Sequence, residues 1–222
     1  METRKMPRGA MARRPLHFFF LLDTSGSMNA GGKIEALNNG IREAIPTLRD
    51  VAEKNPAVSV LVRAVTFSTE ARWHIPEPAS VESFRWNDVA ADGETAMGAA
   101  LTLVSKELTQ EKIGARALPP VLVLVSDGRP TDDFKGGLNK LMETPWGREA
   151  IRVAVAIGSD ADLKRLQQFT GDEAVKPART NRPEALVERI KDVSVAALQS
   201  ASTPVRRNDV PVVEEDDAGS VW

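Results

Sequence analysis

The sequence of 222 residues contains no cysteine. Disulfide bonds and thiolate metal sites are therefore excluded, so any bound metal ion would have to use oxygen ligands or one of the two histidines. A chain without cysteine is compatible with a reducing compartment, and we expect a cytoplasmic protein.

The sequence also lacks a long hydrophobic run and an excess of charge of one sign. A membrane-spanning helix needs about 18 consecutive apolar residues, and the nearest candidate is the short run LHFFFLL at 16–22. Its basic flank resembles a signal peptide, but no small-x-small cleavage site follows it, so we interpret this run as a buried strand. The 29 basic and 31 acidic residues nearly cancel, which predicts no general attraction to nucleic acid or to anionic membranes.

The composition is that of a globular domain, with 42% hydrophobic and 27% charged residues. A chain of this length can form one domain with a substantial core. The periodic patterns stop near residue 200, where prolines and an acidic run begin. We therefore expect a flexible basic N-terminal arm over 1–14, a folded domain over 15–200 and a flexible acidic C-terminal tail over 201–222.

Buried strands alternate with amphipathic helices through the expected domain. Continuous apolar runs are typical of strands buried on both faces, and the segment 69–75 alternates enough to pair with the strand before it as a hairpin. This order predicts an α/β, Rossmann-like fold with a mostly parallel central sheet, one antiparallel edge hairpin and helices on both faces. The expected strands are 16–22, 58–67, 69–75, 119–125, 150–158 and a short edge strand over 173–178, and the expected helices are 33–54, 95–110, 132–144, 160–171 and 183–200.

Oxygen-bearing side chains gather where the expected strands end. Asp23, Ser25 and Ser27 follow the first strand, Asp127 follows the strand at 119–125, and Thr95 precedes a helix. Ligands of open α/β sheets bind beyond the carboxyl ends of the strands, so we expect these side chains on one rim of the sheet.

This set of side chains matches a hard divalent cation. Mg²⁺ prefers six oxygens and is usually bound through only one or two carboxylates. Asp23 and Asp127 would balance its two charges, and the hydroxyls of Ser25, Ser27 and Thr95 would add ligands without adding charge. Such a site would still attract a carboxylate from outside. We expect Mg²⁺, with Mn²⁺ and Ca²⁺ as alternatives.

The same loops carry a family resemblance. The segment DTSGSM resembles the D-x-S-x-S motif of the von Willebrand factor A (vWA) domain, GETAMG resembles its threonine loop, and VSDGRPTDD resembles its distal aspartate loop. The resemblance covers roughly 15–200 and is closest to the bacterial tellurite-resistance (TerY-like) group. It implies a metal-ion-dependent adhesion site in which Ser25 and Ser27 ligate directly, Asp23 and Asp127 act largely through water, and Thr95 enters or leaves as a ligand binds.

The resemblance implies a non-enzymatic module that captures a glutamate or aspartate side chain of a protein partner. TerY-like relatives are associated with bacterial stress-response or defence systems that include a 2C-type phosphatase and a serine/threonine kinase-like protein. We therefore expect a scaffold or regulator in such a system.

Each candidate residue also has an ordinary structural interpretation. Ser25 and Ser27 could cap the helix that begins near Lys33, although the intervening MNAGG makes that cap distant. Asp127 and the glycine after it could form a simple turn, and Thr95 could be a helix N-cap as well as a ligand. The presence of all three loops in order favours the metal site.

Other polar residues near these loops are expected to be structural. We interpret Thr131 and Asp132 as the cap of the following helix. Asp92 and Glu94 lie close to Thr95, and we expect them to be solvated loop carboxylates.

An enzyme is the alternative class of function. An aspartate at a strand end, with hydroxyls and Mg²⁺, is similar to haloacid-dehalogenase-type phosphatases, which need a second aspartate two residues after the nucleophile. Here that position is Ser25, which has no acid/base capacity near neutral pH. His17 and His74 fall in strands without a Ser–His–Asp pattern, and no P-loop or G-x-S-x-G segment is present. A Mg²⁺-dependent phosphohydrolase is therefore the second hypothesis.

Overall fold

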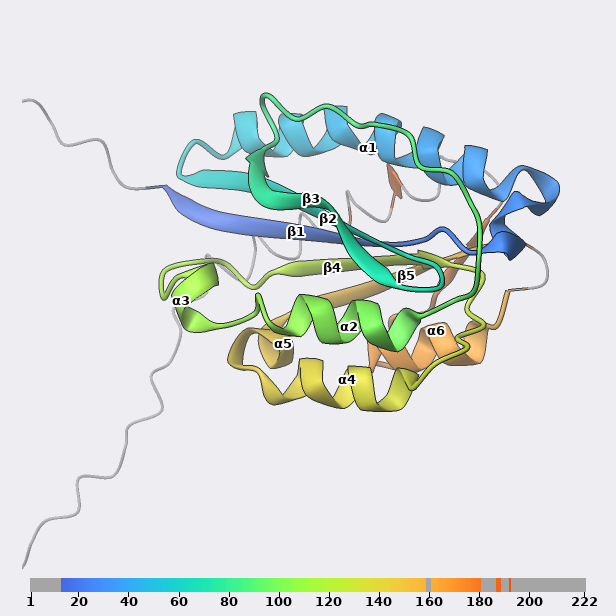
Figure 1. The fold of residues 1–222 in the computed structure, drawn as a ribbon. Coiled ribbons are helices and arrows are strands. Elements are labelled where there is room, and N and C mark those ends of the chain that lie inside the picture. The colour runs from blue at the N-terminus through green and yellow to red at the C-terminus, as the bar shows by residue number, and fades with distance from the viewer. Residues whose placement is uncertain (1–12, 159–160, 181–186, 189–191, 193–222) are drawn as a thin grey trace, which may run out of the picture.

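A six-stranded sheet with helices on both faces forms the described part of the chain (Figure 1). Residues 1–12 of the expected arm, the expected tail and most of the helix expected over 183–200 fall outside the described residues, so these remain predictions. None of the described helices is long and apolar enough to span a bilayer. The computed structural model describes residues 13–158, 161–180, 187–188 and 192.

The strand order is β3-β2-β1-β4-β5-β6. β2 and β3 pair antiparallel at one edge, and every other neighbouring pair is parallel. This confirms the predicted α/β class with one antiparallel edge hairpin. The strands are β1 Arg14–Asp23, β2 Val58–Phe67, β3 Ala71–Ser80, β4 Val121–Ser126, β5 Ile151–Ile157 and β6 Ala178–Thr180.

One long helix covers one face of the sheet, and shorter helices cover the other (Figure 1). α1 continues through Pro46, as its apolar spacing predicts. The helical elements are the 3₁₀ segment η1 Gly26–Gly32, α1 Lys33–Lys54, α2 Met97–Ser105, α3 Gln110–Ile113, α4 Phe134–Glu143, α5 Pro145–Glu149 and α6 Leu163–Thr170.

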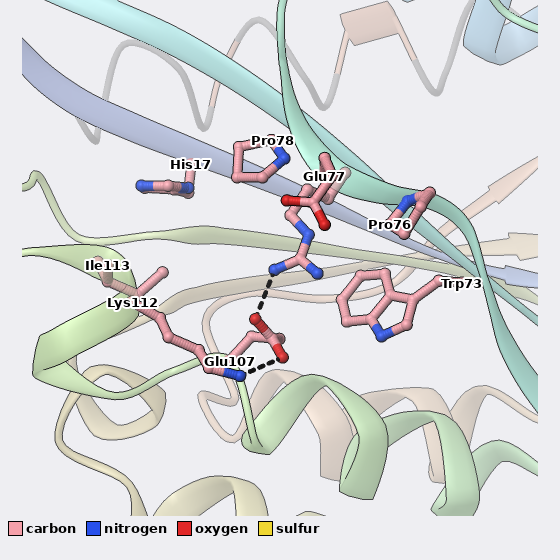
Figure 2. A pocket seen from close by; sticks show the side chains of 9 residues that line it. His17, Trp73, Pro76, Glu77, Pro78, Glu107, Lys112 and Ile113 are labelled. Carbon is pink, nitrogen blue, oxygen red and sulfur yellow. Dashed lines mark hydrogen bonds and ion pairs between the residues drawn. The ribbon is translucent and has the colours of Figure 1, made fainter.

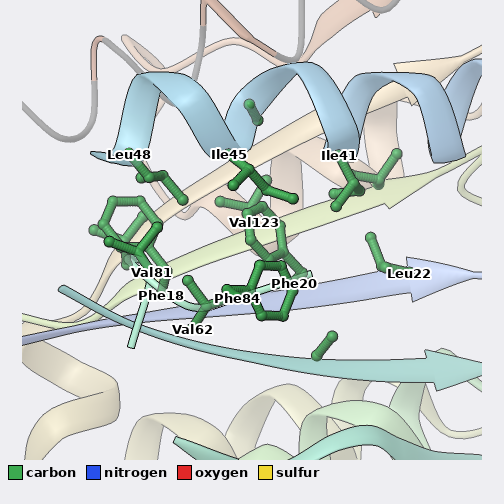
Figure 3. Close-up of a cluster of buried hydrophobic side chains, with 14 of the residues drawn as sticks. Phe18, Phe20, Leu22, Ile41, Ile45, Leu48, Val62, Val81, Phe84 and Val123 are labelled. Carbon is green, nitrogen blue, oxygen red and sulfur yellow. The ribbon is translucent and has the colours of Figure 1, made fainter. Parts of the chain in front are cut away.

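The central strand β1 is buried on both faces, and apart from His17 its run from Leu16 to Leu22 is apolar. Phe18 and Phe20 point into the core beneath α1, where Ile41 and Leu48 meet them (Figure 3). Phe19 belongs to the second core, which α2, α4 and α6 cover. Burying both faces of a parallel strand requires such a continuous apolar run. The two cores therefore hold the carboxyl end of β1 in a fixed place.

Three boundaries differ from the sequence prediction. β1 begins at Arg14, which pairs with Val58, so the strand includes the last residue of the expected arm. The helix expected over 95–110 stops at Ser105, because the residues after it turn back toward the sheet and Thr109 caps the separate helix α3. The last strand of the described residues is β6 at Ala178–Thr180, so the edge strand expected over 173–178 was placed too early.

Two glycines allow α2 and α4 to pack at backbone distance. A Cβ built on Gly137 would overlap the carbonyl group of Gly98, and a Cβ on Gly98 would overlap the carbonyl of Asp133. Interiors packed this closely do not accept an added methyl group without a shift of backbone. Gly137 weakens α4 as an isolated helix, but it sets the distance between the two loops that precede α2 and α4.

We predict that Gly137→Ala lowers the free energy of unfolding by about 1–3 kcal/mol, because the added methyl forces α4 away from α2. Helix propensity alone would give the opposite sign, a gain of up to about 1 kcal/mol. Urea unfolding measures the difference. Asn139→Ala, on an exposed position of the same helix, is the control and should leave stability nearly unchanged.

Candidate metal centre

Asp23 ends β1 and is completely buried. Its Oδ1 accepts a hydrogen bond from the Ser25 backbone N–H at 2.9 Å, and its Oδ2 accepts one from the Ser126 hydroxyl. Burial raises the pKa of Asp23 to about 6, and the nearby charge of Asp127 adds to that shift, while the hydrogen bonds from Ser126 and Ser25 oppose it. The two hydrogen bonds therefore fix the orientation of both carboxylate oxygens. Because burial destabilises the charged form of Asp23, a nearby cation would stabilise it.

The two serines of the motif lie side by side at the start of η1. Ser25 Oγ and Ser27 Oγ are 3.0 Å apart. Ser25 occupies the N-cap position of η1 but makes no capping hydrogen bond, and Gly32, not a serine, precedes α1. The capping interpretation of these serines is thus not supported, and the pair presents two hydroxyl oxygens next to Asp23.

Asp127 follows β4 on the strand adjacent to β1. Its carboxylate is buried, and its Oδ1 has no hydrogen-bond partner. Its Oδ2 lies 3.5 Å from the ammonium group of Lys33. The backbone turns sharply here, because Gly128 has a φ of 76° and a side chain at that position would meet the Asp162 carbonyl. An unpartnered buried carboxylate oxygen is costly, and a cation bound there would compensate it.

The loop that carries Thr95 is attached to both neighbouring loops. The Gly26 backbone N–H donates to the Gly93 carbonyl at 2.9 Å, two residues before Thr95. The Thr95 backbone N–H donates to Thr131 Oγ1 at 3.1 Å, and the Thr131 N–H donates to the Thr95 carbonyl at 2.9 Å. These bonds join the loops after β1, before α2 and after β4, which meet at one end of the sheet (Figure 1). Thr95 is buried there.

The expected capping roles around Thr95 were wrong. α2 begins after Ala96, not at Thr95, and its first N–H groups are capped from another loop. The Asp132 carboxylate accepts from the backbone N–H groups of Gly98 at 2.8 Å and Ala99 at 2.7 Å. Asp133, the next residue, caps α4 instead. Because caps act through space, their partners could not be assigned from chain order.

The residues present fit a divalent cation with few carboxylate ligands. Two aspartates and the serine pair lie at the ends of adjacent strands, and one buried aspartate oxygen has no partner. Within the described segments no group of three or more histidine, aspartate or glutamate side chains could hold a metal. The hydroxyls are therefore needed to complete a ligand set, which suits Mg²⁺ or Mn²⁺. Asp92 and Glu94 are exposed beside this site, as expected.

Two residues near the site, Ser126 and Lys33, were given no role in it from the sequence. Ser126 donates to Asp23 and accepts from the Gly128 N–H at 2.7 Å, which links the ends of β1 and β4. Its position directly before Asp127 was the available signal. Lys33 is 94 positions away from Asp127 in the sequence, and no local pattern indicates that they meet.

A separate cavity of about 480 Å³ lies over β1, β2 and β3, and residues near α3 also line it (Figure 2). The Arg63 guanidinium lies 3.8 Å from the Trp73 ring centroid and donates to Glu107 at 2.8 Å, while Lys112 donates to the other Glu107 oxygen at 2.6 Å. These bonds hold the pKa of Glu107 below its ordinary value even though burial opposes them. Each Glu107 oxygen therefore has a cationic partner.

His17 also lines this cavity. Burial lowers its pKa to about 4, the charge of Arg63 adds to the shift, and a hydrogen bond with the Ile113 backbone opposes it. The imidazole is therefore neutral in the folded protein at physiological pH.

Sequence comparison supports the vWA family that the three loop motifs indicate. The family model described as the von Willebrand factor type A domain matches residues 18–193. Matrilin-3 of Gallus gallus is 30% identical over 132 residues, which are 57% of this chain and 28% of matrilin-3. The chain thus spans well under two thirds of that relative.

Solved structures share the fold at low sequence identity. A von Willebrand factor type A protein from Catenulispora acidiphila has a TM-score of 0.61 at 18% identity, covering 83% of this chain and 43% of that one. BatB from Bacteroides thetaiotaomicron has a TM-score of 0.59 at 14% identity, covering 85% and 100%. Manganese-loaded TRAP protein from Plasmodium vivax has a TM-score of 0.56 at 19% identity, covering 80% and 74%.

We predict that His17 makes stability depend on pH between about 6.5 and 4. The unfolded chain takes up a proton below 6.5, whereas the folded protein does not until about 4. The free energy of unfolding should therefore fall as pH decreases through this window, by up to about 3 kcal/mol. Urea unfolding of wild type and His17→Gln isolates the effect: the difference at pH 8 is the packing cost, and that difference should shrink at pH 4.5. An unchanged difference would contradict a neutral His17.

Proposed function

Because the chain belongs to the von Willebrand factor type A domain family, we propose that it is a non-enzymatic protein-binding module that depends on a divalent cation. The physiological ion in this proposal is Mg²⁺, and the captured group is a glutamate or aspartate side chain of a protein partner. The observation that carries the proposal is the buried Asp127 oxygen without a partner, next to the buried Asp23. The proposed ligand residues are Asp23, Ser25, Ser27, Thr95 and Asp127.

The five proposed ligand residues supply both the charge and the oxygen ligands that a divalent cation needs. Asp23 and Asp127 supply two negative charges, which balance a divalent cation without exceeding it. Ser25 and Ser27 bring neutral oxygens, so the site retains its attraction for a further carboxylate. A bound cation supplies a strong, directional bond to that carboxylate. The exposed Asp92 and Glu94 at the rim repel acidic groups of a partner that come close to them. They therefore favour a partner whose carboxylate extends to the metal ion without other acidic groups beside it.

The geometry argues against a phosphohydrolase. A nucleophilic aspartate needs a free oxygen facing the substrate, but Asp23 is fully buried and both of its oxygens accept hydrogen bonds. Ser25 stands where a haloacid-dehalogenase-type enzyme has its acid/base aspartate. A generic phosphatase assay checks the point, and turnover that Asp23→Asn abolishes would favour the enzyme.

The choice of cation has indirect support. The P. vivax TRAP protein shares the fold and was solved loaded with manganese, which supports the choice of a divalent cation. Mn²⁺ and Mg²⁺ both accept oxygen ligands in six-coordinate sites. Mg²⁺ is our proposal for the cell, with Mn²⁺ and Ca²⁺ as alternatives in vitro.

The biological setting that we propose rests on the resemblance of four segments, LLDTSGSM, TFS, TAMGAAL and SDGRPTDD, to the TerY-like group. It is a cytoplasmic scaffold or regulator in a bacterial stress-response system of the tellurite-resistance type, or in a defence system. A 2C-type phosphatase and a serine/threonine kinase-like protein are the proposed partners. Neither nucleic acid nor a membrane is part of the proposal, in keeping with the balanced charge.

We predict that Mg²⁺ or Mn²⁺ stabilises the protein against unfolding, by about 3 kcal/mol at a hundredfold excess over Kd, and that EDTA reverses this. Ser25→Ala combined with Ser27→Ala should abolish the stabilisation, because two ligands are lost while the carboxylates remain. Ser83→Ala is the matched control, since Ser83 is exposed and follows β3. Calorimetric titration measures Kd directly. Absence of uptake by the wild-type protein would refute the site.

We predict that partner capture requires both the cation and the serine pair. The full chain is used as bait in a bacterial lysate with Mg²⁺, with EDTA, and as the Ser25→Ala variant. A specific partner should be retained only by the wild type with Mg²⁺, and replacing one of its acidic residues by the amide should release it. A partner retained equally in EDTA would show that partner binding does not depend on the metal site.

A further inference from the structure

Lys33 is a buried cation beside the proposed metal site. It is only 7% exposed, and its Nζ lies 3.5 Å from Asp127 Oδ2. Both side chains are almost completely removed from water. At that depth an unneutralised ammonium or carboxylate is strongly disfavoured, so each group stabilises the other.

The start of a helix is an unfavourable position for a lysine. Lys33 is the first residue of α1, where the helix dipole disfavours positive charge. The two preceding glycines have φ values of 65° and 72°, a left-handed backbone that turns the chain from η1 into α1. This turn places the first side chain of α1 against the end of β4. The ion pair with Asp127 thus offsets an unfavourable helix position.

A divalent cation and the Lys33 ammonium would require the same carboxylate. Asp127 has two oxygens, one facing Lys33 and one without a partner. Adding a second, doubly charged ion beside the ammonium brings like charges together in a region that water screens poorly. Either Lys33 moves away or the cation binds more weakly.

We propose that Lys33 is a built-in competitor of the metal ion: its ammonium neutralises Asp127 in the metal-free protein and must be displaced when a divalent cation binds. This inference rests on the proposed function and concerns the regulation of the same site. Lys33 sets the metal affinity below what the ligands alone would give. Because Lys33 is the first residue of α1, its displacement also couples metal binding to the start of that helix.

The test compares two properties that should change in opposite directions in Lys33→Met. In EDTA the variant should be less stable than wild type, because the Asp127 charge is left buried without its ammonium partner. In calorimetric titration with Mg²⁺ it should bind at least about tenfold more tightly, because the like charge is gone. Lys54→Met, at the exposed end of the same helix, is the control and should change neither property.

The outcomes separate this inference from the proposed function. If wild type and Lys33→Met bind Mg²⁺ equally, or the variant binds more weakly, Lys33 is not a competitor although the metal site stands. If neither protein binds Mg²⁺ or Mn²⁺, the metal site itself is refuted, and the competition with it. Binding by the variant alone would support both proposals.

A measurement on the wild-type chain covers the case in which Lys33→Met does not fold. Reductive methylation followed by mass spectrometry reports the exposure of each lysine. Labelling of Lys33 should rise on addition of Mg²⁺ but not of Na⁺, while Lys54 in the same sample should be labelled equally throughout. A Lys33 that stays protected in saturating Mg²⁺ would overturn the proposal.

Discussion

The structure depends on two carboxylates that are buried at the ends of adjacent parallel strands. Asp23 and Asp127 are both inaccessible, and the charge of Asp127 contributes to the raised pKa of Asp23. Such an arrangement is unfavourable unless positive charge or hydrogen-bond donors compensate it. The serine hydroxyls, the backbone N–H groups of the turns and the Lys33 ammonium all act in this way. The rim is therefore organised around a need for positive charge, which is the property that a divalent cation satisfies.

The fold was predictable because its strongest signals are local. The apolar run of β1 must be buried on both faces, and that single inference requires a sheet with helices on each side. The positions of Asp23 and Asp127 at the ends of parallel strands then follow from topology. Features set by contacts through space were not predictable. Asp132 caps α2 from another loop, and Lys33 reaches Asp127 across 94 positions.

The break in the helix expected over 95–110 has the same kind of cause. Glu107 forms ion pairs with Arg63 from β2 and with Lys112. The helical periodicity of the sequence does not reveal these contacts. Helix propensity alone would extend α2 beyond Ser105, whereas the tertiary contacts of Glu107 favour an end to the helix there. Glycines in a helix interior, such as those of α4, ordinarily weaken the helix. In the structure Gly137 permits the close approach of α4 to Gly98, so the same residue costs helix propensity and sets the loop geometry.

Two buried polar clusters in the described part of the chain differ in how their charge is compensated. In the cluster around Arg63, each oxygen of Glu107 has its own cationic partner from the chain. At the rim, Asp127 pairs with Lys33 through one oxygen while its other oxygen has no hydrogen-bond partner, and Asp23 accepts hydrogen bonds from neutral donors. In the first cluster the charge of Glu107 is compensated within the chain, and Arg63 links Glu107 to Trp73 of the edge hairpin. The second leaves one buried carboxylate oxygen without a hydrogen-bond partner, and this is the feature on which the proposed metal site rests.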